Sequence, residues 1–184
     1  MKKYIFILLA AMTFVACSED ESNPTVFDYG AKLGEDKEFY LEEGMQPMSV
    51  ADFQDVVVNH PWKCLESHLI MDDGSINEED YYSETEGGGP YQFRLDKESL
   101  HYIVFTSSYY PPSYVEVANP YKYDENTNKV HSYPRLTLLS YDKENEQLTM
   151  IVHPSMNLYL LSKYQRMPEE WWTELCKSVV KKIN

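Results

Sequence analysis

The stretch that decides the fold covers residues 135–166 and reads RLTLLSYDKENEQLTMIVHPSMNLYLLSKYQR. It holds three runs rich in aliphatic and aromatic residues, at 135–141, 148–152 and 157–166. Polar residues at 142–145 and a Pro-Ser pair at 154–155 separate these runs. Short apolar runs bounded by turn residues are typical of β-strands joined as hairpins. The stretch therefore predicts three consecutive antiparallel strands.

The same pattern continues toward the N-terminus as far as Trp62. Apolar and polar residues alternate between Tyr91 and Asp96, which predicts a half-buried strand. The polar segment 124–128 lies between two further runs, which predicts a hairpin. The other expected strands are 62–71, a run that contains Tyr81 and Tyr82, 100–106, 115–123 and 129–133. Together they amount to about eight strands, joined mostly by short loops.

Consecutive hairpins must hide their sheet edges, either in two stacked sheets or by closing into a barrel. Greek-key sandwiches usually need long connections between the sheets, and only one long segment, 107–113, interrupts the series. We therefore expect a mainly β domain at 49–184 whose strands close into an antiparallel barrel.

One helix is expected on each side of the barrel strands. Ser49 is a suitable N-cap for a short helix that His60 and Pro61 bring to an end. After the strands, 168–183 predicts an amphipathic helix with acids at its start and lysines toward its end. Its apolar stripe consists of Trp172, Leu175, Cys176, Val179 and Ile183. We expect this stripe to pack on the barrel wall; a partner-binding helix is the alternative.

A short helix, Trp62 at the start of the first strand, successive hairpins and Arg166 near the end of the last strand resemble a lipocalin-like barrel over residues 49–166. The resemblance implies that Trp62 closes the barrel floor. It also implies that Arg166 stacks across Trp62 in a cation–π contact worth about 0.5–2 kcal/mol. His60 stands where this family has Gly, two positions before the Trp. The likeness is to the small lipocalin-like lipoproteins of Bacteroidota.

The sequence does not decide which side chains of the first strand, 62–71, point into the barrel. If Trp62 points inward, Glu66 and His68 do so too, and they would form a polar floor for a ligand. The opposite parity buries Leu65, Leu69 and Met71 instead. A β-bulge would reconcile the two arrangements. Beyond Cys64 we favour the dry core, because unpaired buried polar groups are costly.

Residues 1–16 predict an export signal, because a positive start precedes an apolar run at 4–16 that is shorter than the roughly 20 residues of a membrane span. The sequence Phe14-Val15-Ala16-Cys17 resembles a bacterial lipobox, which implies that Cys17 is lipidated and becomes the new N-terminus. Several acyl chains, such as palmitate, would hold the protein stably in a membrane. The Ser and acids that follow resemble the surface-export signal of Bacteroidota lipoproteins. We therefore expect an outer-membrane lipoprotein exposed on the cell surface.

The chain is strongly acidic, with 30 Asp and Glu against 16 Lys and Arg and a formal charge of −14. A nucleic-acid partner is not expected, because phosphate affinity comes from clustered basic residues. The acidic segment 17–48 is expected to be a solvated tether. Within it, Phe39, Tyr40 and Leu41 could instead pack against the domain as a short strand or turn.

Catalytic and metal-binding motifs are missing from the sequence. It has no Gly-x-Ser-x-Gly, no His-Glu-x-x-His and no phosphate-binding glycine loop, and its five histidines are scattered. We therefore expect no cofactor, no metal and no enzymatic activity. Outside the cytosol, Cys64 and Cys176 could form a disulfide. Two buried thiols are the other interpretation.

The one unusual surface segment contains Tyr109, Tyr110 and Tyr114 around two prolines. Such rings could form a platform for a sugar, an apolar ligand or a protein, or could cap a barrel mouth. Our leading hypothesis is a non-catalytic module that binds a small molecule or a glycan fragment. The alternative is a surface protein-interaction or inhibitor protein whose barrel is packed solid.

Overall fold

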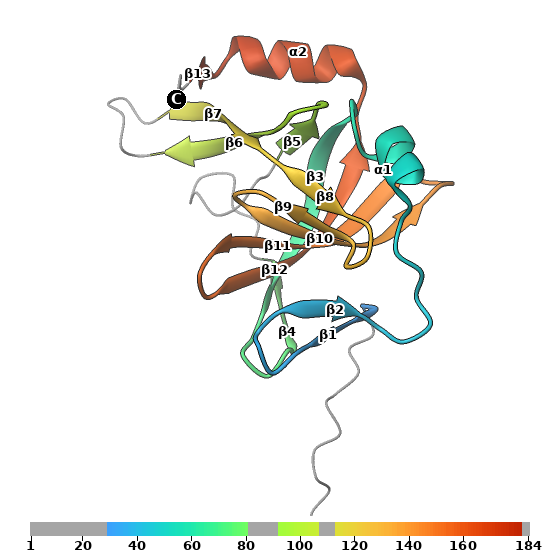
Figure 1. Cartoon of the computed structure of the whole chain (residues 1–184). Helices are drawn as coiled ribbons and strands as arrows, with labels where there is room; N and C mark the ends of the chain where they lie inside the picture. The colour runs from blue at the N-terminus through green and yellow to red at the C-terminus, as the bar shows by residue number, and fades with distance from the viewer. Residues whose placement is uncertain (1–28, 81–91, 107–112, 182–184) are drawn as a thin grey trace, which may run out of the picture.

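The computed structural model describes residues 29–80, 92–106 and 113–181 (Figure 1). Helix α1 (Val50–Val56) precedes the main sheet and helix α2 (Glu169–Lys177) follows it. The first strands are β1 (Ala31–Leu33), β2 (Phe39–Leu41), β3 (Pro61–Ile70), β4 (Ile76–Asp80), β5 (Gln92–Leu95) and β6 (Ser99–Thr106). The later strands are β7 (Ser113–Pro120), β8 (Lys122–Asp124), β9 (Lys129–His131), β10 (Arg135–Asp142), β11 (Gln147–Ser155), β12 (Leu158–Arg166) and β13 (Val180–Lys181).

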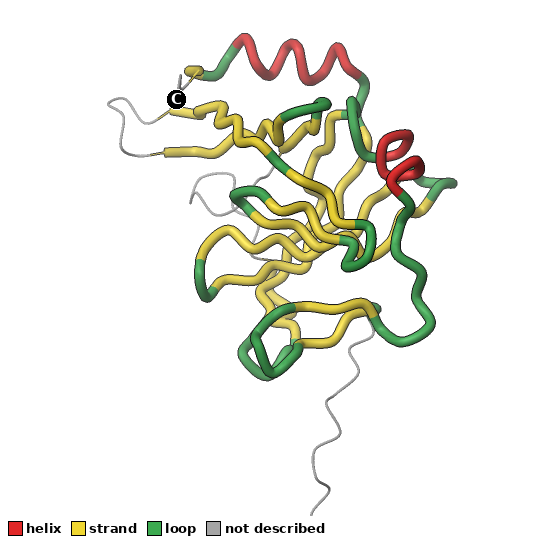
Figure 2. The backbone as a smooth tube through the Cα atoms, viewed as in Figure 1, coloured by secondary structure: helices red, strands yellow, loops and turns green. Residues whose placement is uncertain are grey.

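The main sheet curls into a nearly closed antiparallel barrel of about 9 strands, which confirms the predicted mainly β barrel. The run expected at 115–123 is divided at Tyr121 into two strands, β7 and β8. These two strands follow each other along the chain, and β7 pairs with β6 while β8 pairs with β9 (Figure 2). One continuous segment therefore joins the two ends of the sheet. The first and last long strands, β3 and β12, pair as expected, with Trp62 opposite Arg166.

The barrel interior is occupied by side chains. Trp62 and Phe93 are 0% exposed and their rings stack, with centroids 6.2 Å apart, while Tyr164 meets Phe93 edge-on at 5.0 Å. Helix α1 begins at its N-cap Ser49, as predicted, and buries Phe53, whose ring stacks on Tyr123 at 3.9 Å. The indole Nε1 of Trp62 donates a hydrogen bond to the carbonyl oxygen of Val57, 3.2 Å away. Helix α1 is thereby packed onto the core of the barrel.

Part of the way along β3, the set of side chains that faces the barrel interior changes. The β3–β12 register shifts at Leu65, so Trp62 and Cys64 belong to the core but Leu65 is 44% exposed. After this bulge Leu69 packs against the core, as the dry-core interpretation expects, and Met71 is exposed. Glu66 and His68 therefore stay outside the lumen, while Ser67 is buried and its hydroxyl is paired with that of Ser162 at 2.7 Å. Of the three residues that the favoured parity would bury, only Leu69 packs against the core.

Part of the acidic segment 17–48 is folded onto the barrel instead of forming a solvated tether. Strands β1 and β2 pair as a hairpin, and Ala31 and Phe39 are buried. They form a second apolar cluster with Ile70, Leu139 and Ile151 on β3, β10 and β11. The few apolar residues of this acidic stretch face the barrel and bury its outer surface there. Residues 17–28 of the expected tether lie outside the described part of the chain.

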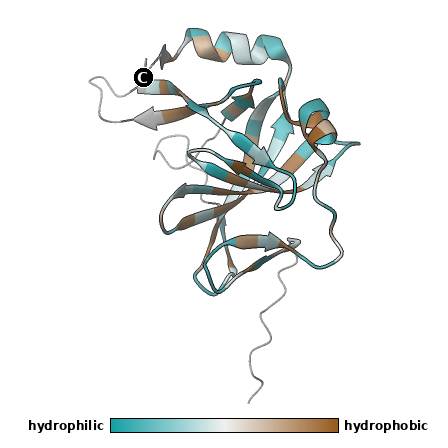
Figure 3. Ribbon diagram, viewed as in Figure 1, coloured by the Kyte–Doolittle hydropathy of each residue, from teal (hydrophilic) through white to brown (hydrophobic). Residues whose placement is uncertain are grey.

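Helix α2 is shorter than the helix predicted at 168–183. It ends at Lys177, and Val180 and Lys181 then pair in parallel with Val115 and Glu116 of β7. The β-branched Val179 and Val180 favour extended backbone over helix. Colouring by hydropathy shows polar residues in the loops and a mixed surface on α2 (Figure 3). Among residues 29–80, 92–106 and 113–181, neither helix is long and apolar enough to cross a membrane.

Candidate ligand-binding groove

Glu66 and His68 lie on the outside of the barrel and not in its lumen. The Glu66 side chain is half-exposed, and its carboxylate is 3.8 Å from Nζ of Lys163 on β12. His68 pairs across the sheet with Leu161, which packs in the outer cluster. The bulge at Leu65 is the physical reason, because an extra residue turns every later side chain of the strand to the other face. The polar lumen floor is therefore not formed.

Of the three tyrosines expected to form a platform, only Tyr114 is described. It lies on β7 and is 39% exposed. Tyr109 and Tyr110 lie outside the described residues. The aromatic platform therefore stays a prediction.

The two cysteines of the domain are present as thiols and form no bridge with each other in the described structure. Cys64 is buried in the barrel core, and its Sγ donates to the carbonyl oxygen of Glu66 at 3.3 Å. Cys176 lies on α2, which is packed outside the barrel wall. Cys64 faces the core and α2 lies on the outer side of the sheet, so the disulfide that the sequence left open is not formed.

Arg166 is the cross-strand partner of Trp62, but its guanidinium is engaged elsewhere. Nη2 of Arg166 lies 2.9 Å from Nδ1 of His60, and Nη1 lies 3.1 Å from Oε1 of Glu146. Burial and the Arg166 charge lower the pKa of His60, so its ring stays a neutral acceptor. The contact with His60 thus holds the guanidinium away from the expected cation–π position over Trp62.

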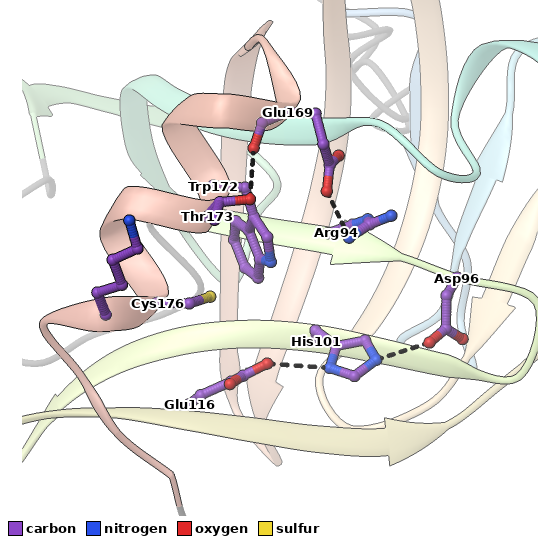
Figure 4. A pocket seen from close by; sticks show the side chains of 9 residues that line it. Arg94, Asp96, His101, Glu116, Glu169, Trp172, Thr173 and Cys176 are labelled. Carbon is purple, nitrogen blue, oxygen red and sulfur yellow. Dashed lines mark hydrogen bonds and ion pairs between the residues drawn. The ribbon is translucent and has the colours of Figure 1, made fainter.

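A groove lies between α2 and the outer face of β5, β6 and β7 and is here called the α2 groove (Figure 4). Its volume is about 510 Å³. The lining residues are Arg94, Asp96, His101, Glu116, Glu169, Trp172, Thr173, Cys176 and Lys177. A smaller hollow lies on the other side of Glu169, between His60, Glu146 and Arg166.

Strand alternation supplies the wall of the α2 groove. On β5, Phe93 and Leu95 point into the core, so Arg94 between them points outward. On β6, Leu100 and Tyr102 face the core, so His101, the partner of Arg94, points to the same outer face. Helix α2 supplies the opposite wall, and its Trp172 is only 5% exposed. The groove is therefore a junction between the polar outer face of the sheet and a helix anchored by one buried indole.

His101 lies between two carboxylates at the wall of the groove. Its Nε2 is 2.9 Å from Oδ2 of Asp96, and its Nδ1 is 3.2 Å from Oε1 of Glu116. Both ring nitrogens can donate at the same time in the imidazolium form. While both contacts hold, neither nitrogen is available to take a proton from a substrate. This arrangement holds the two strands and the β5–β6 turn together and does not resemble a general base.

Asp96 is fixed by the turn that it begins. Burial alone would raise the pKa of Asp96, but its carboxylate accepts hydrogen bonds from the backbone N–H groups of Glu98 and Ser99 and from His101. These bonds hold the pKa below its ordinary value. The carboxylate therefore stays ionised beside the imidazole.

A second ion pair joins the helix to the sheet. Nη1 of Arg94 lies 2.8 Å from Oε1 of Glu169 in the first turn of α2. Arg94 and Lys177 are the cations of the lining, beside the carboxylates of Asp96, Glu116 and Glu169. Within the described ranges, no cluster of three or more His, Cys, Asp or Glu is placed to hold a metal ion. The groove therefore offers hydrogen-bond donors and acceptors of both signs.

The sequence alone did not single out the residues of this groove. The alternation in β5 indicates that Arg94 and Asp96 share a polar face, and the helix stripe includes Trp172. What brings them together is the position of α2 over β5, β6 and β7, and that position depends on contacts between segments far apart in the chain. No local pattern reports such contacts.

A comparison of the chain with family models, with curated proteins and with solved structures finds no match. The fold therefore defines the class as a mainly β protein with a nearly closed antiparallel barrel.

Proposed function

We propose that this protein is a lipocalin-like lipoprotein of the cell envelope, and that it acts as a non-catalytic module binding a small molecule or glycan fragment in the α2 groove. The observation that carries the proposal is the α2 groove itself, a hollow of about 510 Å³ lined by charged groups of both signs and by Trp172. Hollows that hold small ligands usually measure about 300–1,000 Å³. The groove is therefore of suitable size.

The interior of the barrel is a poorer candidate for the site. Trp62, Phe93, Met150 and Tyr164 are essentially unexposed and pack together in its core. Protein interiors packed in this way leave few voids larger than a water molecule. A ligand of sugar size would have to displace core side chains, whereas the α2 groove is already open to solvent.

The chemistry of the lining favours an uncharged, hydroxyl-rich ligand. The lining mixes cations with carboxylates, so it presents no region of a single sign that would select a charged ligand. A sugar hydroxyl both donates and accepts, so it can bind a carboxylate such as Glu169 as well as a guanidinium such as Arg94. The indole of Trp172 adds an apolar surface at the base of the groove.

Filling the groove tests this proposal. Thr173 lines the groove on α2, whereas its neighbour Glu174 does not and its side chain is 71% exposed. Four uncharged sugars, N,N′-diacetylchitobiose, N-acetylglucosamine, galactose and cellobiose, are titrated against the wild type by calorimetry, and then against Thr173→Trp and Glu174→Trp. We expect at least one sugar to bind, Thr173→Trp to weaken it at least about tenfold, which is about 1.4 kcal/mol, and Glu174→Trp to leave it unchanged.

Two outcomes would count against the proposal. If none of the four sugars binds the wild type, the glycan proposal fails. If one binds but Thr173→Trp retains its affinity, the site is not in the α2 groove. Circular dichroism of both variants shows whether the fold has survived the added indole.

The filled core also supports the alternative, a surface protein that binds or inhibits another envelope protein. Such a protein needs no cavity, and a formal charge of −14 suits a basic partner through electrostatic steering. Capture of partners from envelope extracts at low and high salt separates the two functions. A specific partner whose binding weakens with salt would favour the alternative.

The location is part of the proposal and depends on Cys17, which lies outside the described residues. The sequence Phe14-Val15-Ala16-Cys17 supports it by its likeness to a lipobox. Lipidation would place the protein on the outer membrane, exposed to the surroundings of the cell. Mass spectrometry of the mature N-terminus, with Cys17→Ser as control, tests it directly.

A further inference from the structure

The β1–β2 hairpin is attached to the barrel by an apolar face and by a polar latch. The apolar face consists of Ala31 and Phe39, and the Phe39 ring meets Tyr159 edge-on at 5.0 Å. The hydroxyl of Tyr159 also donates to the carbonyl oxygen of Lys37 at 2.7 Å. The hairpin therefore packs on the barrel and is held at its turn.

The polar latch, here the Glu38 latch, joins the hairpin to β9 and β10. One carboxylate oxygen of Glu38 lies 2.9 Å from Nζ of Lys129, and the other bonds the guanidinium of Arg135. The Lys129 side chain is only 6% exposed, and its Nζ lies 4.6 Å from the ring centre of Tyr40. A buried ammonium is costly without its counter-ion, so undocking the hairpin leaves Lys129 unsatisfied.

The hairpin also fixes where the chain leaves the barrel toward the N-terminus. The hydroxyl of Tyr29, the first described residue, donates to the carbonyl oxygen of Gly74 in the β3–β4 turn, 3.0 Å away. Strand β3 runs from this turn to Pro61, beside the hollows next to α2, over 10 residues. That length corresponds to about 30 Å. The chain thus leaves the molecule at the end opposite α2 (Figure 1).

Docking shortens the tether considerably. Residues 18–28 alone can reach at most about 40 Å from Cys17, whereas a free chain up to Met48 could reach about 110 Å. With the short reach and the exit at the β3–β4 turn, this turn is the part of the barrel held nearest to the anchor, within about 40 Å of it. With the long reach and an exit at α1, the anchor would hold no face of the barrel near the membrane.

We propose that the docked β1–β2 hairpin orients the barrel on the membrane, with the β3–β4 turn toward the lipid and the α2 groove facing away from it. The inference rests on the proposed lipidation of Cys17. It gives the Glu38 latch a purpose beyond stability, because it keeps the binding site directed toward the surroundings of the cell.

Energy transfer from the protein to the membrane tests the orientation. Full-length lipidated protein, with Cys64→Ala and Cys176→Ser, is added to preformed vesicles of phosphatidylethanolamine and phosphatidylglycerol that contain rhodamine-labelled lipid. A donor dye is attached at Asp72→Cys in the β3–β4 turn or at Glu174→Cys on α2, both exposed positions. We expect transfer from position 72 to be at least about twofold more efficient than from position 174, because about 30 Å separates the two ends.

Charge reversal in the hairpin supplies the matched pair of variants. Glu38→Lys places a third cation beside Lys129 and Arg135 and should release the hairpin, so that the two dye positions give similar transfer. Glu35→Lys makes the same change at an exposed position of the same hairpin and should keep the wild-type difference. Circular dichroism checks that the barrel of each variant is folded.

Three results would overturn the proposal, and they are distinguishable. Equal or stronger transfer from position 174 in the wild type rejects the orientation. A wild-type difference that persists in folded Glu38→Lys rejects the hairpin as its cause. Protein that fails to float with the vesicles rejects the lipid anchor itself. Sugar binding in the α2 groove is measured in a separate experiment, so none of these three results decides whether the groove binds a sugar.

Discussion

At the scale of single residues, His60 determines where the guanidinium of Arg166 lies. Its ring accepts from Arg166 at Nδ1, and its Nε2 lies 3.1 Å from the carbonyl oxygen of Asp55 at the end of α1. The guanidinium is thereby held at the junction of α1, β12 and the loop that carries Glu146. The resemblance implied that Arg166 stacks on Trp62, but the His60 ring provides a competing acceptor for the guanidinium.

The Glu38 latch predicts a pH dependence of stability. Burial would raise the pKa of Glu38, but hydrogen bonds and charge from Lys129 and Arg135 hold it below its ordinary value. The unfolded chain then binds the proton more readily than the folded one. The latch therefore contributes fully above the ordinary glutamate pKa, and its contribution is lost as the pH falls through the lowered value.

We expect Glu38→Gln to lower the free energy of unfolding by about 1–3 kcal/mol near neutral pH, because Lys129 loses its charged partner. The difference from the wild type should shrink as the pH falls through the lowered pKa of Glu38, so it should be larger near neutral pH than in acid. Urea denaturation at the two pH values measures it. Glu35→Gln, an exposed change in the same hairpin, serves as control, and a loss independent of pH would contradict the ion pair as the cause.

At the scale of elements, α2 depends on one side chain. A helix of 9 residues has little stability by itself, since isolated helices shorter than about 12–15 residues are marginal in water. Trp172 is its only buried residue, and the Arg94–Glu169 pair is partly exposed, so the indole contributes most of the attachment. The same indole forms the base of the α2 groove.

Trp172→Ala should therefore release α2 while the barrel stays folded. Hydrogen exchange of the α2 amides is expected to become at least about tenfold faster, whereas β10, β11 and β12 keep their protection. Glu174 lies two residues further along α2 and its side chain is exposed. Glu174→Ala should therefore leave the exchange of the α2 amides unchanged. Equal loss of protection in the barrel strands would show that α2 and the barrel unfold as one unit.

The elements also show which sequence signals are reliable. Strand positions followed from alternation and turn residues, as in β5 with Phe93 and Leu95 buried, because these patterns are local. The sequence allowed a bulge in β3 but could not place it at Leu65, because the position depends on the pairing of β3 with β12. The early end of α2 at Lys177 results from the pairing of β13 with β7, which helical periodicity cannot report.

At the scale of the whole molecule, the hairpin completes the barrel's outer surface. Ile70, Leu139 and Ile151 are buried beneath it, and they would face solvent if it were absent. The acidic composition of 17–48 indicated a tether, because most residues of the segment are polar or charged. Its packing is decided by a few apolar residues, Ala31 and Phe39 among them. The predicted boundary at Ser49 marks the start of α1 but not the start of packed structure.

Truncation should reveal this dependence. A protein that begins at Ser49 is expected to lose at least about 2–4 kcal/mol of unfolding free energy relative to one that begins at Tyr29, because the outer cluster and Phe39 are no longer buried. It should also bind a hydrophobic dye more strongly. Thermal and urea unfolding of the two proteins measure the difference, and equal stability would mean that the hairpin adds nothing to the fold.

The pairing of β3 with β12 has a consequence for the order of folding. The two strands come from opposite ends of the domain, and Trp62 meets Arg166 only after nearly every other strand has been made. Contacts between such distant segments carry a high loop-closure cost and slow the search for the native state. We therefore expect the barrel to close late in folding, when β12 reaches β3.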